Sequence, residues 1–442
     1  MVVFLLVVIG ELLLILLAAG KVPLHYNLRN LSIRWKTTLL TALAFTLVIG
    51  LLVVMLAFVN GMRRLTEGTG QEGNVLVLAE GATDEAFSNL PVDPLSEIEQ
   101  QPLVVRENGK PLASRETYMV VNQLIPDAPP GRPNRRFLQV RGIEDPLRAA
   151  RVHGIELAQG RWFSASGSAE INDPDGDGSV LAIEVVLGQG IAREMGRNRP
   201  DAARQSAQDP DRLLPGDTFS VGNRTFTIVG IMEGVGSTFT SEVWAKRSLV
   251  APLFGKENYS SLVLATRDAA AARQFKDFLH TEYKRVALEP YVETDYYASL
   301  SQTNEQFLVA IVFITVVMSV GGVFGVMNTM FAAISQRIKD IGVLRLLGYG
   351  RLAILISFLL ESLMIALVGG LIGCALGSLA DGTQATSVVS SHQGGGKFVV
   401  LRLVVDGPIL GAGLLLSLGM GLVGGLLPAI RAVRLRALDA LR

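Results

Sequence analysis

Four long apolar runs constrain the fold of this 442-residue chain more than any other feature. They cover roughly residues 38–59, 307–333, 353–380 and 408–428. Each run reaches the ~20 residues that a helix needs to cross about 30 Å of hydrocarbon. The composition agrees, because 49% of the residues are hydrophobic, 18% are charged and the mean hydropathy is +0.39. These runs predict an α-helical transmembrane bundle with four core spans.

A fifth apolar stretch, residues 1–20, is interrupted only by Glu11. It lacks the basic region that opens a secretory signal peptide. An extra span, an interfacial helix and an early start codon are the alternatives for it.

Basic residues set the expected orientation. They gather before the first run, between the second and third runs, and after the last run, whereas the 381–406 connection holds only Lys397 and Arg402. We therefore expect the first three segments to be cytoplasmic and the 61–305 block to lie outside.

Within residues 61–305, the side chains alternate in the way that is typical of β-strands at 74–78, 136–141 and 224–230. Gly222-Asn223 is typical of a hairpin turn. A helical pattern covers 267–285, where Phe275, Phe278 and Leu279 would share a face. The fold class is therefore a membrane bundle with a large α+β extracytoplasmic domain. The expected parts are 1–20, a possible extra helix; 21–60, the lead-in and first core span; 61–305, the outer domain; and 306–442, three spans with a basic tail.

The segment 335–351 links the second and third runs. Its basic residues outnumber its one acid, Asp340, and its apolar residues recur near helical spacing. The basic residues are Arg337, Lys339, Arg345 and Arg351, and the apolar ones are Ile338, Ile341, Leu344, Leu346 and Leu347. The pattern predicts a short amphipathic helix on the cytoplasmic surface.

Residues 328–348 resemble the signature of MacB/FtsX-type ABC transporter permeases. In that family a span ends in Asn-x-Met and is followed by Arg-x-x-Glu-Ile-Gly-x-Leu-(Arg/Lys)-Ala-Leu-Gly. Here the run is Asn-Thr-Met-Phe-Ala-Ala-Ile-Ser-Gln-Arg-Ile-Lys-Asp-Ile-Gly-Val-Leu-Arg-Leu-Leu-Gly. The tail 428–441 and the lead-in 23–31 also resemble family segments. Asp340 replaces the usual Glu, and the tail lacks the usual Asp-Pro.

The resemblance implies that 335–351 docks on a cytoplasmic ABC ATPase subunit. The residues it assigns to coupling are Arg337, Lys339, Asp340, Ile341, Gly342, Leu344, Arg345 and Gly348. The alternative is a basic loop that only fixes topology, which would need neither a defined helix nor a C-cap at Gly348. The resemblance also implies a bacterial inner-membrane location, a second permease copy or paralogue, membrane lipid and a periplasmic adaptor as partners.

The chain has no phosphate-binding loop, because none of its Gly-Lys pairs is followed by Ser or Thr. We therefore expect no cofactor in this chain, with ATP and magnesium on a partner ATPase. Enzyme chemistry finds little support, since the four histidines are scattered and no Gly-x-Ser-x-Gly motif occurs. A formal net charge of +0 also argues against nucleic-acid binding.

Small residues recur at every fourth position inside the spans, which lets helix backbones approach closely. They are Gly321, Gly325, Gly369, Gly373 and Gly377, followed by Gly421 and Gly425. Packing within one chain and packing between subunits are both open. An acid within the third run, Glu361, predicts a pairing with a basic or polar group near the cytoplasmic end.

Residues 173–184 fit the spacing of a calcium-binding loop. The predicted ligands are Asp173, Asp175, Asp177, Ser179 and Glu184. No amphipathic helix flanks the loop, and 183–187 is strand-like, so a solvated acidic turn is the favoured alternative.

The sequence thus predicts a permease subunit that couples ATP hydrolysis on another chain to movement in the outer domain. The expected work is efflux or extraction of a lipidic, peptide or drug-like substrate. Two alternatives are a scaffold that activates an envelope hydrolase and a membrane-anchored sensor without an ATPase.

Overall fold

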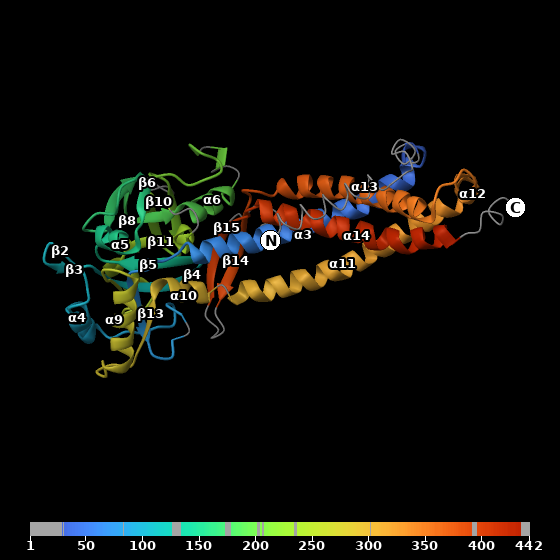
Figure 1. Ribbon diagram of the computed structural model, residues 1–442. Helices are drawn as coiled ribbons and strands as arrows, with labels where there is room; N and C mark the ends of the chain where they lie inside the picture. Colours follow the sequence, from blue (N-terminus) through green and yellow to red (C-terminus); the bar gives the residue numbers. More distant parts are fainter. Residues whose placement is uncertain are drawn as a thin grey trace. The chain divides into compact units, whose positions relative to one another are not determined.

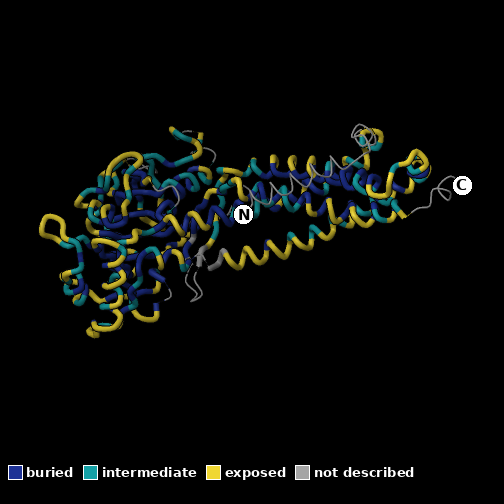
Figure 2. The backbone as a smooth tube through the Cα atoms, viewed as in Figure 1, coloured by how far each residue is buried: buried dark blue, intermediate teal, exposed yellow. Residues whose placement is uncertain are grey.

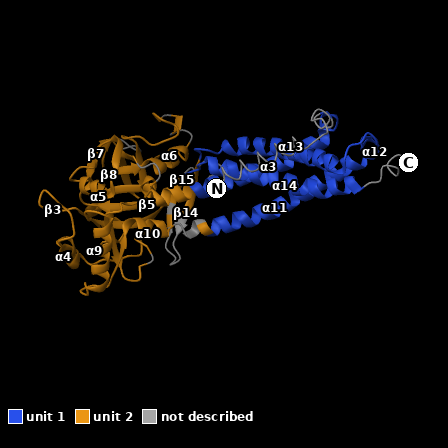
Figure 3. Cartoon of the chain, viewed as in Figure 1, with its two compact units in different colours: residues 1–60, 306–383, 402–442 blue, residues 61–305, 384–401 orange. Residues whose placement is uncertain are grey.

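The computed structural model describes residues 29, 31–82, 84–125, 134–172, 178–200, 204–205, 207–233, 237–300, 302–390 and 396–434 (Figure 1). The predicted helix 1–20 lies outside these residues. The chain divides into a helical unit (1–60, 306–383 and 402–442) and a sheet unit (61–305 and 384–401) (Figure 3). The segment 384–401, grouped above with the membrane part, instead folds with the sheet unit.

Among the described residues, the helical unit contains four helices that are each long and apolar enough to cross a membrane. They are α3 (Trp35–Glu67), α11 (Gln302–Ser335), α13 (Arg351–Ser378) and α14 (Gly407–Arg434). At 1.5 Å of rise per residue, even the shortest, with 28 residues, extends about 40 Å. The prediction of four core spans is confirmed.

Glycines bring α13 against two neighbouring helices. A methyl group added at Gly369 would lie 2.6 Å from the Ala42 carbonyl oxygen of α3, and one at Gly373 would lie 2.8 Å from that of Thr46. Thr46 uses this closeness, because its Oγ1 donates to the Gly369 carbonyl at 3.1 Å. Glycines of α14 approach α13 in the same way, as at Gly421 and Ala366. These contacts lie within one chain.

The helix α11 is exposed along most of its length (Figure 2). Only 6% of its most apolar stretch is buried, against 72% for α13. A methyl group at Gly321 or Gly325 would meet no described atom outside its own stretch of helix. The packing predicted for these two glycines is therefore absent from the described part of this chain.

The sheet unit is built on one sheet of eleven strands, nine of which follow the order β13-β1-β12-β4-β5-β11-β8-β10-β6. The strands are β1 (Asn74–Ala79), β4 (Ala113–Leu124), β5 (Arg135–Ile143), β6 (Glu156–Gly160), β7 (Ser168–Asn172), β8 (Ser179–Gly188), β9 (Thr218–Val221), β10 (Arg224–Glu233), β11 (Glu242–Lys246), β12 (Ser261–Ala265) and β13 (Leu288–Val292). Strand β7 pairs with β8, and β9 pairs with β10. Most pairs are antiparallel, but β5–β11 and β8–β10 are parallel.

Helices and two short hairpins complete the sheet unit. The helices are α4 (Val92–Glu99), α5 (Pro146–His153), α6 (Gln189–Arg197), the 3₁₀ turn η1 (Thr238–Ser241), α8 (Arg247–Leu253), α9 (Ala269–Thr281) and α10 (Glu293–Ser299). The hairpins are β2 (Arg106–Glu107) with β3 (Lys110–Pro111), and β14 (Gln384–Ser390) with β15 (Gly396–Arg402). The predicted mixture of strands and helices is confirmed.

Two hydrophobic clusters fill the sheet unit. One gathers around β5, β8, β10 and α6, and the other around β1, β12 and α9, where Phe275 and Leu279 are buried. The predicted turn at Gly222-Asn223 joins β9 to β10, and Gly222 takes the positive φ of 60° that such a turn needs.

Candidate functional site

The predicted coupling segment contains a short helix, α12 (Ile338–Leu346). It ends in a Schellman motif: the Gly348 N–H donates to the Arg345 carbonyl at 3.2 Å, and the Tyr349 N–H donates to the Leu344 carbonyl at 3.1 Å. Gly348 has the left-handed φ of +95° that this motif requires. The segment therefore has a defined end, and Gly348 occupies the predicted C-cap region.

One face of α12 is open to solvent. It consists of Lys339, Asp340, Val343, Leu346 and Leu347, which recur at helical spacing. Three of them are large apolar side chains that are 47–70% exposed. We call this set the exposed face.

The opposite side of α12 packs against the helical unit. Ile341 and Gly342 are buried, whereas Ile338, Leu344 and Arg345 are half-buried. The predicted apolar stripe is therefore wrong in part, because Leu346 and Leu347 lie on the exposed face. A nine-residue helix makes only two and a half turns, so apolar residues at near-helical spacing fit both of its sides.

Arg337, just before α12, is buried in an ion pair and is not a surface residue. Its guanidinium makes two hydrogen bonds to Glu361 of α13, at 2.9 and 3.1 Å, and both side chains are 5% exposed. The basic partner predicted for Glu361 is thus confirmed. The pair fixes the start of α12 to α13 in bidentate geometry.

A second group of buried charges lies in the sheet unit, and we call it the ionic cluster. Seven side chains with 0% exposure take part: Arg141, His153 and Lys397 as cations, and Glu85, Glu116, Glu242 and Glu293 as carboxylates. They come from β4, β5, β11, β15, α5, α10 and the segment after β1. The central strands of the sheet thus carry charge between two apolar clusters.

Arg141 is the centre of the ionic cluster. Its Nη1 donates to Glu85 at 2.7 Å and also to Glu116, while Nε and Nη2 both donate to Glu242 at 2.7 Å. The face of Tyr118 lies 5.0 Å from the guanidinium carbon. One arginine therefore satisfies three carboxylates at once.

His153 is held between two carboxylates. Its Nδ1 lies 2.8 Å from Glu293 and its Nε2 lies 2.7 Å from Glu116. Ionised carboxylates accept and cannot donate, so both ring nitrogens carry protons and the imidazole is charged. Burial alone would lower its pKa, but Glu116 and Glu293 outweigh burial and raise the pKa to about 10.

Glu116 shows the reciprocal effect. Burial would raise its pKa, but His153 and Arg141 outweigh burial and lower the pKa to about 2. Burial acts in the same way on Glu85, whose pKa Arg141 and Lys397 hold well below the usual range. These carboxylates are ionised at neutral pH.

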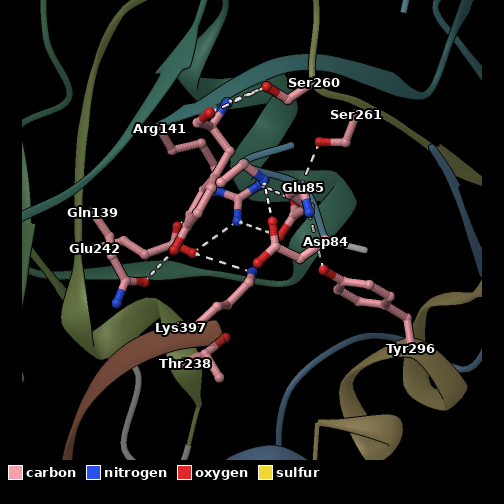
Figure 4. A network of polar contacts seen from close by, with 12 residues as sticks. Asp84, Glu85, Gln139, Arg141, Thr238, Glu242, Ser260, Ser261, Tyr296 and Lys397 are labelled. Atoms are coloured by element: carbon pink, nitrogen blue, oxygen red, sulfur yellow. Dashed lines mark hydrogen bonds and ion pairs between the residues drawn. The ribbon is translucent and has the colours of Figure 1, made fainter. Parts of the chain in front are cut away.

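Lys397 reaches the ionic cluster from the β14–β15 hairpin, the connection between α13 and α14 (Figure 4). Its Nζ forms an ion pair with Glu85 and lies 4.0 Å from Glu242. The next strand residues hold the hairpin in place, since the Val400 N–H donates to Ser241 Oγ at 2.8 Å. A segment that the sequence shows only as a connection between two apolar runs thus anchors itself in the sheet unit.

The ionic cluster was not predicted from the sequence. Lys397 had one visible signal: it is a single charge between a glycine run and the apolar run Phe-Val-Val-Leu. A charge inside such a strand-like run predicts a buried pair. Nothing in the sequence pointed to its partners, which are more than 100 residues away.

The calcium-loop prediction falls mostly on undescribed residues, because Asp173, Asp175 and Asp177 lie outside the described part. Ser179 begins β8, and its hydroxyl donates to Glu170. Glu184 lies within β8, where one oxygen accepts from Arg161 and the other accepts from the Ser164 N–H at 2.6 Å. Among the described residues no group of three or more His, Cys, Asp or Glu is arranged to hold a metal ion. Calcium binding by 173–184 stays a prediction.

Two family descriptions match this chain. Residues 38–280 match the MacB-like periplasmic core domain, and residues 312–437 match the FtsX-like permease C-terminal domain. The first match covers more than half of the chain and includes most of the sheet unit. The second includes α12 and the β14–β15 hairpin.

Two relatives of this chain also have permease in their names. The chain is 28% identical over 308 residues to the macrolide export ATP-binding/permease protein MacB of Nitrobacter winogradskyi, covering 66% of this chain and 41% of that protein. It is 24% identical over 324 residues to the uncharacterized ABC transporter permease YknZ of Bacillus subtilis, covering 69% and 77%. The chain thus spans less than half the length of the MacB relative.

Among solved structures, one match to this chain is the periplasmic region of MacB from Actinobacillus actinomycetemcomitans. The identity is 16%, the TM-score is 0.32, and the match covers 54% of this chain and 94% of that one.

Proposed function

Because this chain belongs to the MacB/FtsX-type family of ABC transporter permeases, we propose that it is the membrane subunit through which a separate ABC ATPase drives work on the outer side. The chain itself would be non-catalytic, with ATP and magnesium bound by the ATPase. We further propose that it lies in a bacterial inner membrane, with the sheet unit outside. The basic residues around α12 and in the tail support this orientation.

The exposed face of α12 is the observation that carries the proposal. A helix that only fixed topology would need basic residues and no apolar surface. Here Val343, Leu346 and Leu347 are exposed beside Lys339 and Asp340, which is the mixed composition of a protein–protein contact. We propose that this face docks on the ATPase.

The contacts that hold both ends of α12 in place suit it to transmit a movement. Its start is tied to α13 by the Arg337–Glu361 pair, and its end is fixed by the Schellman motif. The chain then runs through α13 directly into the β14–β15 hairpin, whose Lys397 is anchored in the ionic cluster. A displacement of α12 would thus be passed along α13 to a segment of the sheet unit.

The substrate class follows from the family and stays a proposal: a lipidic, peptide or drug-like molecule that is exported or extracted at the outer side. The MacB relative is named for macrolide export, which favours efflux. The relatives reported above are named as an export protein and a permease, so they give no support to a hydrolase scaffold or to a sensor. A periplasmic adaptor and membrane lipid are further proposed partners.

A second permease copy or paralogue would cover α11. This helix exposes apolar side chains along its length and presents Gly321 and Gly325 on an open face, the small-residue spacing that suits close helix contact.

The decisive experiment uses the full complex with its ATPase in lipid nanodiscs. Asp340→Lys reverses a charge on the exposed face, and Leu347→Asp makes its apolar part polar. Both positions are solvent-exposed, so we expect normal folding with loss of most of the permease-stimulated ATP hydrolysis. Asp277→Lys makes the same charge change on exposed α9 of the sheet unit and serves as the control. Wild-type stimulation in both α12 variants would refute docking at this face.

A further inference from the structure

A cavity of about 330 Å³ lies within the sheet unit, between the β14–β15 hairpin and the elements β5 and α6. Its volume is at the lower end of those that hold small molecules. Arg136 and Phe137 of β5, Ile191 and Glu194 of α6, and Val388 and Val400 of the hairpin line it. The ionic cluster takes no part in this lining, so the cavity is a separate site.

Arg136 gives the cavity its chemistry. The side chain is only 9% exposed, yet its Nε and Nη1 have no hydrogen-bond partner among the described residues. Burial lowers the pKa of this guanidinium, although Glu194 opposes the effect. A buried guanidinium with unused donors is costly unless an anion pairs with it.

The contrast with Arg141 on the same strand is instructive. Arg141 is also buried, but five hydrogen bonds to three glutamates satisfy it. Across the strand pair from Arg136, Gln123 has an Oε1 that likewise meets no hydrogen-bond partner in the described part of the chain. Among the described residues, glutamates accept from all three nitrogens of Arg141, whereas Nε and Nη1 of Arg136 have no acceptor.

The rest of the cavity wall is mainly apolar. Phe137 and Val388 are 48% and 39% exposed, and Ile191 and Val400 add buried apolar surface. Glu194 also faces the cavity; burial raises its pKa, although Arg136 opposes this, so its negative charge is less favoured than on an exposed carboxyl. An occupant would meet one cation and a larger apolar wall.

We propose that this cavity binds an anionic amphiphile, in which a carboxylate or phosphate group pairs with Arg136 and a short apolar chain lies against Phe137 and Val388. A bidentate contact from Nε and Nη1 suits either anion. The inference concerns the sheet unit and does not rest on the ATPase coupling proposed above. Because the hairpin forms one wall, the bound molecule would touch the segment that joins α13 to α14.

Isothermal titration of the full-length chain in a neutral detergent tests the proposal with four matched probes. Octyl phosphate and octanoate carry both features, octanol lacks the charge, and inorganic phosphate lacks the chain. We expect saturable binding of one or both anionic amphiphiles, at least about tenfold tighter than that of octanol or phosphate. The preference between the two would identify the head group.

Variants assign the binding to this cavity. Arg136→Gln should weaken binding of the anionic amphiphile at least about tenfold, whereas Arg224→Gln, a change at an exposed arginine of β10, should leave it unchanged. Val388→Trp keeps Arg136 but fills the cavity from an exposed hairpin position, so it should abolish binding. It carries the test if Arg136→Gln fails to fold.

Three results would overturn the proposal. Equal binding of octanol would show that no anion is recognised, and equal binding of inorganic phosphate would show that the apolar wall contributes nothing. Unchanged binding in folded Arg136→Gln or Val388→Trp protein would place the binding elsewhere.

Discussion

Buried charge occurs in both units of this protein, but in two different designs. In the described part of the helical unit, the buried charges form one isolated pair, Arg337 and Glu361, in which each group satisfies the other. The sheet unit holds the seven-member ionic cluster, in which Arg141 alone serves three carboxylates and His153 bridges two.

The two designs differ in whether charges can be removed without leaving a partner charge buried alone. Replacing both members of an isolated pair leaves no buried charge behind, and such replacements are often neutral or stabilising. Removing any member of a shared network leaves its partners buried without compensation. The pair can therefore be exchanged as a unit, whereas the cluster can only be kept whole.

The chain contains a local reporter for each design. Trp244 lies beside the ionic cluster, where its Nε1 donates to Glu242 at 3.0 Å, so in a chain with Trp35 of α3 changed to Phe the tryptophan fluorescence reports unfolding of the sheet unit. Cys374, the chain's one cysteine, is buried in α13, so its reaction with a thiol-reactive dye reports opening of the helical unit.

The largest effect is expected for Arg141→Met. Three ionised glutamates lose a partner, so the sheet unit should lose about 5 kcal/mol, the upper end of the range for breaking buried pairs. The unfolding temperature followed by tryptophan fluorescence should fall steeply. Arg148→Gln, at a partly exposed ion pair with Asp145, should change stability by less than about 0.5 kcal/mol. Equal stability of the two variants would contradict a shared network.

The next effect is expected for Arg337→Met, which leaves Glu361 buried alone and should cost about 3 kcal/mol. Dye labelling of Cys374 should then occur at a lower temperature. The double variant Arg337→Met with Glu361→Leu should recover most of this loss. Arg351→Met, at an exposed position where α13 begins, is the control. A double variant no better than the single one would show that this pair is not self-contained.

The smallest change per step is a pH dependence, which accumulates gradually over several pH units. The fold raises the pKa of His153 from 6.5 to about 10. The stability that the charged imidazole contributes to the fold is therefore fully present below pH 6.5 and is lost as the pH rises through 10. The loss is at most about 1.4 kcal/mol per pH unit for one proton. Unfolding of the sheet unit between pH 7 and 10 should depend on pH less in His153→Gln than in wild type or in His280→Gln, an exposed-histidine control.

The acid side of the same profile follows from Glu116. Its pKa is lowered from 4.5 to about 2, so its contribution is present above pH 4.5 and disappears as the pH falls towards 2. A profile that was flat on both sides would show that these ion pairs contribute no net stability.

Local periodicity was sufficient to predict the spans, several strands and the turn at Gly222-Asn223. It was not sufficient where tertiary contacts bury a polar residue that the local pattern alone would not place in the core. On β5, the polar residues Gln139 and Arg141 are both buried, Arg141 at the centre of the ionic cluster and Gln139 in a hydrogen bond with Tyr118. An alternating strand pattern cannot distinguish a polar face towards water from one towards buried counter-charges.

The coupling segment shows another limit. Its helix and its end at Gly348 follow from the sequence, but the exposed face does not, because nine residues are too few to define one apolar side. Arg337 was expected among the surface charges, and only the position of Glu361 on a neighbouring helix places it inside.

The late position of Lys397 in the chain also has a consequence for synthesis. The other six members of the ionic cluster lie between Glu85 and Glu293, so the last one leaves the ribosome roughly 100 residues after them, or about 5–20 s later at usual elongation rates. During this interval α11 and α13 are synthesised, and Glu85 does not yet have its ion pair with Lys397. The core of the sheet unit is therefore finished only after most of the helical unit has been translated, and its completion marks a nascent chain that has been built through its third span.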